Sequence, residues 1–539
     1  MAATDEWLAF ATGDGHERWC LVGLLARMTC TEAIETLCCS WPVHCWNACA
    51  MSGNTPPLHL HFDRGTLLLD ALGQEVPRGR HGAAGTLPGL VWDPRTLQFR
   101  APACRYAEVV TAARERELGV EDHVFAPRVG LPAPLLRAPA LRPYQAAAVA
   151  SFVANEERGV LVMPTGSGKT HVGMALAARA GSCLCLVPTR VLLHQWRGRL
   201  LAAGAGAVGV LGDGQRCVLP LTVTTFESAY RHMAELGNRF EMVLVDEVHH
   251  FGGGLRDEAL EMCAAPRRLG LTATPPGSGS LGRLRMLIGP VVFEQNLAEL
   301  CGDFLAEFEV VVLSLPLSAV ERRCYERDYA AFVATLRTFK RLFPGGSFGG
   351  FVSWAQASRE GRRALRAYRR ARELLALTDA KHRMIGELLA RHASARCMVF
   401  TESNRAAYRI AEEYLVSPIT CDIGRMEREA VLSAFDRGEI RAVVSARVLN
   451  EGVDVPDADV AIIVGGSFGE REHVQRVGRL LRPRPGKRAL VYELVGDVPQ
   501  EERRGNERRR GLLIGQHGGR GGTAERSLPG SDSRLRGEP

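Results

Sequence analysis

The sequence predicts an α/β protein in which a small β-rich N-terminal domain precedes two tandem domains built on parallel sheets. From residue 158 onward, buried apolar strands alternate with helices, and the same arrangement repeats after residue 396. Continuous apolar strands joined by helices are typical of parallel sheets covered on both faces. Ahead of them, residues 58–100 carry short strand-like runs separated by Gly and Pro turns, which predicts the smaller β-rich domain.

Length and composition fit several packed globular domains. The chain has 539 residues, of which 46% are hydrophobic and 24% are charged. Apolar runs stay shorter than the roughly 18 to 20 residues that cross a bilayer, and the N-terminus lacks a basic-then-apolar export pattern. We therefore expect a cytoplasmic protein with no membrane partner.

The charge balance and the cysteines restrict the partners and the redox state. The formal net charge of +7 suits a polyanionic partner without requiring one. The 15 cysteines form an odd set without an export signal, so reduced thiols are expected. Six cysteines and His44 lie within the first 49 residues, but their spacing matches no regular zinc pattern.

The first 130 residues divide at a Pro-containing loop. Residues 1–57 show weak periodicity, so we expect a poorly ordered extension, and Met51 offers an alternative start. Residues 58–130 are expected to form the β-rich domain, with a helix near 106–117. Its strands are expected at 58–62, 66–69, 89–92 and 97–100.

The two α/β domains are expected over 135–300 and 301–500. The strands of the first are expected at 159–163, 183–187, 221–225, 242–245 and 269–272. The strands of the second are expected at 397–401, 419–422, 442–445, 461–464 and 489–494.

Two further segments differ from the α/β pattern. Residues 318–378 look helical and dense in arginine, which fits either a solvated helix face or a basic arm lying along phosphates. The Arg- and Gly-rich residues 501–539 are expected to be disordered.

A glycine-rich loop directly follows the first apolar strand and precedes a helix. Glycines let backbone N–H groups curl around phosphate oxygens, and the helix N-terminus favours negative charge. The lysine of such a loop neutralises β- and γ-phosphate charge, and the hydroxyl after it can bind Mg²⁺. We expect the nucleotide-binding residues to be Thr165, Gly166, Ser167, Gly168, Lys169 and Thr170. The general pattern has Gly where Met163 stands.

Two carboxylates end the apolar strand near 242–245. At the C-terminal edge of a parallel strand, Asp246 can hold Mg²⁺ and Glu247 can orient the hydrolytic water. Thr170 and Asp246 are thus the expected metal residues. Following a phosphate-binding glycine-rich loop (P-loop) at this distance, the pair predicts an NTPase that uses Mg²⁺.

A helix in the second α/β domain carries Gln475, Arg479 and Arg482. The two arginines stand at i and i+3 on one face. They could reach the γ-phosphate from a second domain and stabilise transition-state charge. We include all three residues in the expected catalytic set.

These segments stand in the order found in superfamily 2 helicases, which the chain resembles over residues 140–495. The matching blocks, besides those above, are Arg142 with Gln145, 188–190, 224–226, 272–274, 400–403 and 450–456. The resemblance implies two RecA-like domains, adenine contacts from Arg142 and Gln145, and nucleotide contacts from Gly452 and Asp454.

Within that superfamily the chain is most similar to the XPB (xeroderma pigmentosum group B) helicases in their archaeal and bacterial form. The similarity rests on 246–250, 264–275 and 465–482, and on 88–95 and 100–102 in the β-rich domain. It implies a damage-recognition-like N-terminal domain, a thumb-like region over 318–378, and ATP-driven 3′ to 5′ movement on DNA in repair. The family's Arg-Glu-Asp element is replaced by 275–279, so strand separation is implied less directly than translocation.

Backbone contacts to DNA are expected from hydroxyls and amides at the ends of strands, because such contacts position a strand without reading its sequence. The expected nucleic-acid-binding residues are Thr189, Arg190, Thr225, Thr401 and Ser403. His249, Thr272 and Thr274 are the expected coupling residues, although ordinary hydrogen-bonded side chains would look the same in a sequence.

Two alternatives remain open on the sequence. An RNA helicase would share the P-loop and arginine-helix chemistry, which does not distinguish the sugar. An ATP-gated subunit that remodels nucleic acid for a nuclease partner would also share it, without robust unwinding. For the main interpretation, the expected DNA is single-stranded, forked or damaged duplex.

Overall fold

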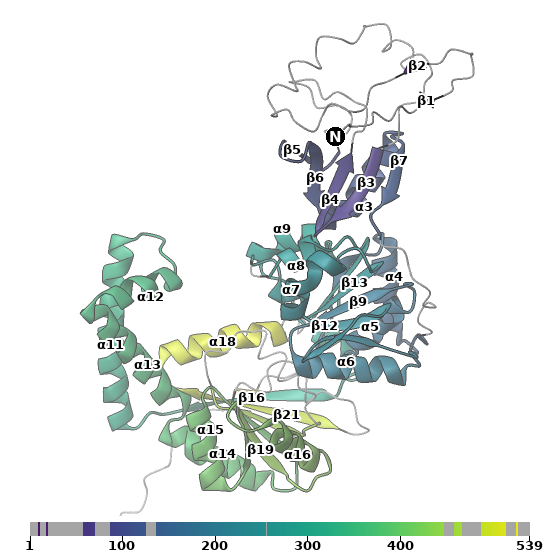
Figure 1. Cartoon of the computed structure of the whole chain (residues 1–539). Coiled ribbons are helices and arrows are strands. Elements are labelled where there is room, and N and C mark those ends of the chain that lie inside the picture. Colours follow the sequence, from purple (N-terminus) through teal and green to yellow (C-terminus); the bar gives the residue numbers. More distant parts are fainter. Residues whose placement is uncertain are drawn as a thin grey trace, which may run out of the picture.

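The fold is known from a computed structural model. It describes residues 58–70, 87–125, 136–254, 256–446, 457–465 and 487–513, and three two-residue strands. Two of these, β1 (Ala9–Phe10) and β2 (Arg18–Trp19), pair antiparallel, and the third is β22 (Ala524–Glu525). Figure 1 shows a small N-terminal domain, a first α/β lobe and a second α/β lobe with a helical projection. Within these ranges, no helix combines the length and the apolar character that a bilayer crossing needs.

The N-terminal domain is a five-stranded sheet with one covering helix. In spatial order, its strands are β5 (Val91–Asp93), β6 (Gln98–Pro102), β4 (Thr66–Asp70), β3 (Leu58–Asp63) and β7 (Val120–His123). A short 3-10 turn, η2 (Ala103–Arg105), leads into α3 (Tyr106–Glu115). Neighbouring strands run antiparallel except β3 and β7, which are parallel. Alternation places Leu58 and Leu60 in the domain core, which confirms the predicted β-rich character.

The first lobe contains an eight-stranded sheet. In spatial order, its strands are β11 (Gln215–Cys217), β10 (Gly209–Gly212), β12 (Leu221–Thr225), β9 (Cys183–Val187), β13 (Met242–Asp246), β14 (Arg267–Thr272), β8 (Arg158–Val162) and β15 (Val291–Glu294). All neighbouring pairs are parallel except β10 and β11. The five strands expected from the sequence are all present. The sequence interpretation missed β10, β11 and β15, because they are short and lie toward the sheet edges.

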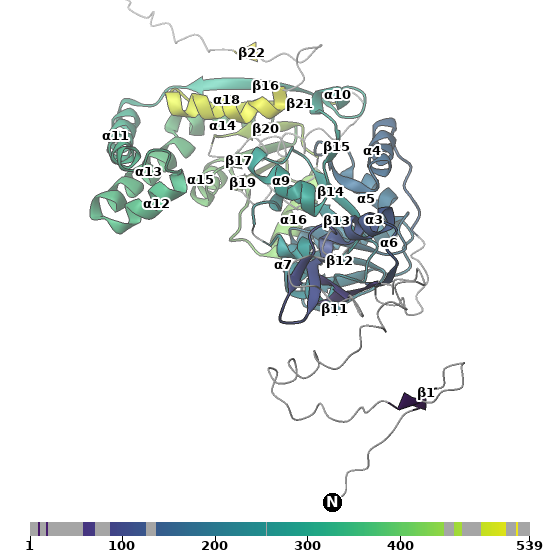
Figure 2. The same cartoon turned by 90° about the horizontal axis from the view of Figure 1, so that it is seen from above.

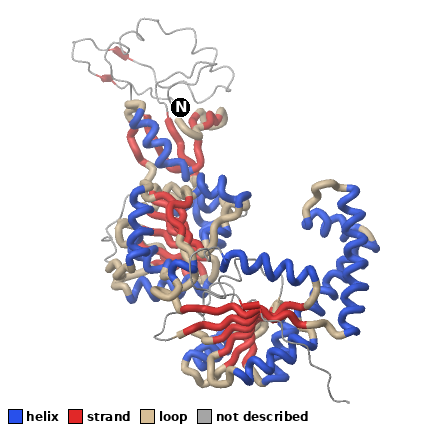
Figure 3. The backbone as a smooth tube through the Cα atoms, turned by 180° about the vertical axis from the view of Figure 1, so that it is seen from behind, coloured by secondary structure: helices blue, strands red, loops and turns tan. Residues whose placement is uncertain are grey.

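Helices cover this sheet on both faces. They are α4 (Pro143–Ala154), α5 (Lys169–Ala177), α6 (Arg190–Ala202), α7 (Phe226–Leu236), η3 (Val248–His250), α8 (Glu258–Glu261), α9 (Ser278–Leu287) and α10 (Leu297–Leu300). Two buried apolar clusters result, one with Trp196 and Leu244 and the other with Phe226 and Val245. Figure 3 shows the strands of both lobes flanked by helices.

The second lobe is built on an entirely parallel sheet within the described residues. In spatial order, its strands are β18 (Ser417–Ile419), β19 (Ala442–Ala446), β17 (Cys397–Thr401), β20 (Val460–Ile463), β21 (Arg488–Gly496), β16 (Glu307–Leu315) and β22. Helices α14 (Asp379–Arg391), α15 (Asn404–Tyr414) and α16 (Arg425–Asp436) belong to it. The expected tandem parallel-sheet class is therefore confirmed.

Two strands of this lobe differ from the sequence interpretation. β16 was missed, because acidic and apolar residues are mixed in its first three positions, Glu307 to Glu309. The strand expected at 419–422 ends at Ile419, and the hydroxyl of Thr420 accepts a hydrogen bond from the backbone N–H of Asp422 at 3.3 Å. Such a local side-chain bond competes with strand pairing.

The helical projection corresponds to the arginine-dense segment. It consists of α11 (Ala319–Leu342), α12 (Phe348–Ala357) and α13 (Arg359–Ala376), and Figure 2 shows it at one end of the second lobe. Arg370 forms two hydrogen bonds with buried Asp328, at 2.9 and 3.0 Å. Arg363, Arg366 and Arg369 are exposed. Both interpretations of the basic face stay open.

The expected disorder from residue 501 is wrong at its beginning, because α18 (Pro499–Leu513) is a helix that packs on β21. Lys381 is fully buried and pairs with Glu501, and Arg508 pairs with Glu493 at 2.6 Å. Composition predicted disorder here because the segment is rich in arginine and glycine, but the charges of Glu501 and Arg508 are neutralised inside the lobe. Most residues of the expected N-terminal extension, and most of the tail, lie outside the described residues.

Candidate nucleotide and nucleic-acid site

The glycine-rich loop joins β8 to α5 and has the backbone that phosphate binding requires. Gly166 and Gly168 have φ values of 87° and 81°, which L side chains rarely adopt. A Cβ on Gly168 would lie 2.4 Å from Gln145 Nε2, so the turn has no room for one. The loop therefore ends as a bare N-terminus of α5, which suits an anionic ligand.

Lys169 is held by the loop itself. Its Nζ donates to the carbonyl oxygens of Met163 at 3.1 Å and Pro164 at 3.4 Å. The Ser167 hydroxyl donates to the Pro164 carbonyl at 2.7 Å. The ammonium thus lies at the mouth of the loop, with its stem half-buried, where it can exchange these carbonyls for phosphate oxygens.

The start of α4 braces the loop from outside. Tyr144 and Gln145 both donate to the Ser167 carbonyl at 2.7 Å, and the Gln145 Oε1 accepts from the Arg142 backbone N–H at 2.9 Å. The Arg142 guanidinium instead points to the connector between the lobes, donating to the Phe304 carbonyl at 3.2 Å. The structure therefore brings Gln145 against the P-loop and directs Arg142 to its flank.

The two expected metal residues each have an unexpected partner on α6. Asp246, which is 7% exposed, accepts a hydrogen bond from the Trp196 indole Nε1 at 2.8 Å. The Thr170 hydroxyl accepts one from Arg199 at 2.8 Å. Sequence reasoning missed Trp196 and Arg199, because an aromatic and a basic residue on a helix after a Pro-Thr-Arg motif look like ordinary core and surface residues.

Glu247 begins a chain of polar contacts that runs back into the sheet. It has φ 53° and ψ 49°, a left-handed backbone that is costly for a non-glycine residue. His249 Nδ1 lies 3.5 Å from Glu247 Oε2 and 3.1 Å from the Thr272 hydroxyl, which in turn donates to the Thr274 carbonyl at 3.0 Å. The structure thus places the three expected coupling residues in a row, in which Glu247 contacts His249, His249 contacts Thr272, and Thr272 contacts Thr274.

Burial lowers the pKa of His171, which follows the P-loop, and the positive charges of Arg199 and Arg142 lower it further. His171 is therefore mainly neutral near pH 7. A neutral imidazole adds no charge to the loop, so Lys169 is the cation that the loop itself supplies.

The expected nucleic-acid residues of the first lobe lie at the N-termini of α6 and α7. Thr189 and Thr225 cap α6 and α7 by accepting backbone N–H groups at 3.3 and 3.2 Å. Arg190 and Thr225 line a hollow of about 370 Å³, together with Arg216, Arg231 and Ser228. Arg190 is exposed and lies 3.3 Å from Asp213.

The two nucleic-acid-binding residues expected in the second lobe differ in their exposure. Thr401 is completely buried, and its hydroxyl donates to the carbonyl oxygens of Ser403 at 3.2 Å and Ser445 at 3.4 Å. It is not available to a ligand in this conformation. Ser403 is partly exposed, caps α15 and lines a hollow of about 350 Å³ with Arg370, Arg405 and Arg409.

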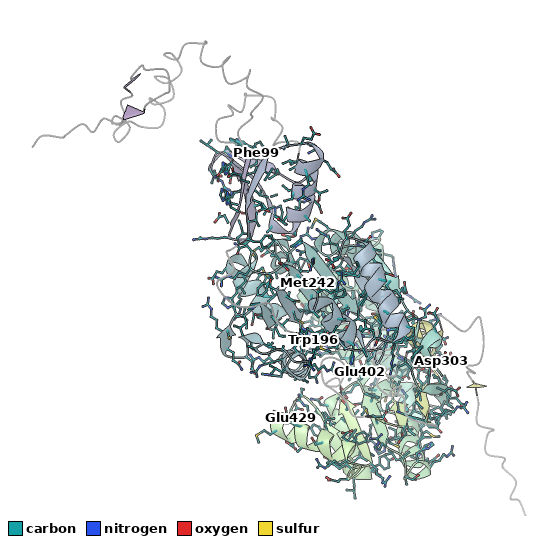
Figure 4. All side chains as sticks on the ribbon, turned by 90° about the vertical axis from the view of Figure 1, so that its right-hand side faces the viewer. Phe99, Trp196, Met242, Asp303, Glu402 and Glu429 are labelled. Carbon is teal, nitrogen blue, oxygen red and sulfur yellow. The ribbon has the colours of Figure 1, made fainter. Side chains whose placement is uncertain are left out.

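Five expected site residues cannot be placed, because they lie outside the described residues. They are Gly452, Asp454, Gln475, Arg479 and Arg482. Figure 4 shows Trp196, and with it the Asp246 end of β13, on the side of the first lobe that faces the second lobe, where Glu402 lies. The second lobe is therefore on the correct side to complete a nucleotide site.

Comparison with known families assigns three segments of the chain. Residues 60–124 match the family described as the xeroderma pigmentosum group B helicase damage recognition domain. Residues 138–277 match the type III restriction enzyme, res subunit, and residues 380–484 match the helicase conserved C-terminal domain. These matches confirm the resemblance that the motifs predicted.

Individual relatives agree with this assignment. A protein named DNA 3′-5′ translocase XPB2, from Sulfurisphaera tokodaii, is 33% identical over 457 residues, covering 84% of this chain and 100% of the relative. The DNA 3′-5′ helicase XPB of Mycobacterium tuberculosis is 29% identical over 371 residues, and 60% of its length is covered. Among solved structures, the Pyrococcus furiosus Hef helicase domain is 18% identical with a TM-score of 0.46, over 70% of this chain and all of that one, which is too distant to add to the argument. The motifs, the fold and the first of these relatives together show that this chain belongs to the XPB family of helicases.

Proposed function

We propose that this protein is an ATP-dependent DNA motor that moves 3′ to 5′ along one strand, in DNA repair. The observation that carries the proposal is that the P-loop and the carboxylates of Asp246 and Glu247 follow the carboxyl ends of β8 and β13, two parallel strands on either side of β14, in a chain of the XPB family. Relatives named as DNA 3′-5′ translocase and helicase support the direction of movement.

The residues present fit a nucleotide with a bound divalent cation. Gly166 and Gly168 give the loop its left-handed backbone turns, a Cβ on Gly168 would fill part of the cradle, and Lys169 provides the positive charge. The Thr170 hydroxyl and the Asp246 carboxylate are the oxygen donors that Mg²⁺ prefers. When bound, Mg²⁺ would neutralise charge on the β- and γ-phosphates. The Thr170 hydroxyl must give up its hydrogen bond with Arg199 before it can bind Mg²⁺.

In this proposal Glu247 orients the attacking water and couples its state to neighbouring residues. Its carboxylate lies beside His249, so a change at the nucleotide can alter the hydrogen bonds of Thr272 and Thr274. These residues lie at the end of β14, directly before 275–279 and α9. Hydrolysis and movement of the first lobe's surface would be coupled through this chain of contacts.

The DNA backbone would follow the hydroxyl-capped helix N-termini of both lobes. Thr189 and Thr225 would supply hydroxyls and Arg190 a guanidinium on the first lobe, and Ser403 would supply a hydroxyl on the second. Such contacts fix position without reading bases. Gln475, Arg479 and Arg482, proposed to complete the site from the second lobe, would link closure to ATP.

A second candidate function is translocation without robust unwinding, as an ATP-gated subunit working with a nuclease partner. The specific observation is that Pro275 to Gly279 replace the Arg-Glu-Asp element of the family, and α9 begins at Ser278. Duplex opening would then depend on the partner. In either case we propose that the protein acts in the cytoplasm.

The test measures ATPase and unwinding together on forked, bubble and 3′-tailed DNA, with RNA of matched sequence alongside. Glu247→Gln and Lys169→Ala should each abolish turnover, whereas Glu258→Gln, an exposed carboxylate on α8, should not. Stimulation by DNA and not by RNA is expected. An active Glu247→Gln enzyme would overturn the role of that carboxylate, and equal stimulation by RNA would favour an RNA helicase.

A further inference from the structure

Three histidines and a glutamate gather on one face of the N-terminal sheet. His59 and His61 belong to β3, and Glu121 and His123 belong to β7. The parallel register pairs His59 with Glu121 and His61 with His123. Because Leu58 and Leu60 point into the domain core, the alternate residues of β3 project from the opposite face. The four side chains therefore form a two-by-two array away from the core.

The distances within this array suit a metal ion. His59 Nδ1 lies 3.3 Å from Glu121 Oε2, and His123 Nε2 lies 3.6 Å from the same oxygen. One ligand atom from each of the three residues lies within 4.8 Å of the others. Zinc bonds to nitrogen and oxygen of about 2.0 to 2.1 Å place tetrahedral ligands about 3.4 Å apart. Two of the three separations already have about this length, and a small rotation of the rings would close the third.

The imidazole rings of the three histidines are also nearly parallel to each other. The His59 and His123 rings are 6.0 Å apart at 12°, and the His61 and His123 rings are 5.2 Å apart at 13°. Neutral imidazole rings can present their nitrogen lone pairs to a shared ion. His61 Nε2 lies 3.9 Å from Asp70 Oδ2, so the array also has a carboxylate at its border.

We propose that His59, Glu121 and His123 bind one divalent transition-metal ion of the zinc class, with water in the remaining position. Two imidazoles and one carboxylate are ligands that suit Zn²⁺, whereas Mg²⁺ and Ca²⁺ prefer all-oxygen sites. The side chains of Glu121 and His123 are 51% and 53% exposed, so an ion can enter from solvent. This site is separate from the nucleotide site, which lies in another domain.

The ion would clamp an edge strand. β7 pairs only with β3 within the described part of the sheet, and the chain leaves it for the first lobe. The Val124 carbonyl, directly after β7, accepts a hydrogen bond from Asn238 of the first lobe at 3.0 Å. Joining β7 to β3 through a metal therefore strengthens the strand through which the N-terminal domain is attached to the motor.

The test uses the full chain, stripped of metal with a chelator and studied without nucleotide. Co²⁺ is titrated as a spectroscopic substitute for Zn²⁺, followed by competition with Zn²⁺. One Co²⁺ per chain is expected, with visible ligand-field bands and no near-ultraviolet thiolate charge-transfer band. A double variant, His59→Gln with His123→Gln, should lose at least about 100-fold in affinity, because even losing a residue that only supports a ligand costs 10- to 100-fold.

Matched variants separate this site from others. His232→Gln, on α7 of the first lobe, should bind Co²⁺ like the parent. Circular dichroism and DNA-independent ATPase should be unchanged in the double variant, which shows that it folds. In the parent, hydrogen exchange at the β7 amides should slow with Zn²⁺ but not with Mg²⁺. In the double variant, Zn²⁺ should not slow it.

Two results would overturn the proposal. One is parental stoichiometry and affinity in the double variant. The other is a thiolate charge-transfer band that persists in it, which would assign the ion to the cysteines among residues 1–49.

Discussion

The indole of Trp196 on α6 donates a hydrogen bond to the Asp246 carboxylate at the end of β13, at 2.8 Å. The two side chains are 2% and 7% exposed, so the bond is shielded from water. Glu247's backbone N–H donates to the other oxygen of Asp246 at 3.1 Å. Trp196 is thus a positioning residue for the carboxylate that we assign to Mg²⁺.

Replacing Trp196 with Phe should therefore weaken the use of Mg²⁺ more than the binding of nucleotide alone. A hydrogen bond to a charged group contributes about 1.5 to 3 kcal/mol, so the Mg²⁺ concentration for half-maximal ATPase should rise about tenfold or more. Titrating Mg²⁺ at fixed ATP measures this. Trp354→Phe, on α12 of the projection, is the control, and an unchanged Mg²⁺ requirement in Trp196→Phe would contradict the assignment.

Thr272→Val should uncouple hydrolysis from DNA. The change keeps the shape of a fully buried side chain but removes the hydroxyl that contacts His249 and donates to the Thr274 carbonyl. We expect the ratio of DNA-stimulated to basal ATPase to fall severalfold. The ratio is the informative quantity, because a purely structural loss would lower both rates together. Thr338→Val, on the exposed face of α11, serves as the control.

Glu501→Gln should destabilise the second lobe strongly. Lys381 is fully buried, pairs with Glu501 and donates to the Leu375 carbonyl at 2.7 Å. Removing one partner of a buried pair leaves a buried charge and costs about 3 to 5 kcal/mol. Urea unfolding measures the loss, and exposed Glu502→Gln is the matched control. Equal stabilities of the two variants would show that α18 does not stabilise the lobe.

The same pair predicts a pH dependence. Burial lowers the pKa of Lys381 below its ordinary value of 10.5. Between the lowered pKa and 10.5, the unfolded chain holds the Lys381 proton more tightly than the folded chain. The contribution of this group to the free energy of unfolding therefore increases as the pH rises. Glu501→Gln should lower the pKa of Lys381 further. The free energy of unfolding that Glu501→Gln loses relative to the parent should therefore become smaller as the pH is raised toward 10.5. Unfolding curves between pH 7 and 10 would show this.

Cysteine reactivity should follow burial. Burial raises the pKa of Cys183 to about 12 and that of Cys185 well above the ordinary value, whereas Cys217 and Cys421 are exposed. Because the thiolate is the reactive form, brief iodoacetamide treatment at pH 8 should modify Cys217 and Cys421 and spare Cys183 and Cys185. Mass spectrometry of the digested protein measures each site. Fast labelling of Cys185 would mean that the centre of the first sheet opens.

Much of the fold follows from local sequence. The strands at 183–187 and 221–225 match the structure to the residue, because fully buried parallel strands are continuous apolar runs that end at turn signals. The short edge strands and β16 could not be recognised so readily, because edge strands bury less and carry mixed residues. Helix α18 was wrongly expected to be disordered. Composition does not reveal that its charged residues form buried ion pairs with Lys381 and Glu493.

The sequence by itself determined the chemistry of this protein. The order of motifs, the P-loop and the carboxylate pair specify a nucleotide-driven XPB-type motor, because each depends on residue types at fixed spacing along the chain. Only the tertiary structure decided which distant side chains meet: Trp196 with Asp246, His249 with Thr272, and His59 with Glu121 and His123. These contacts depend on strand register and helix packing, which bring together residues that lie 23 to 64 positions apart.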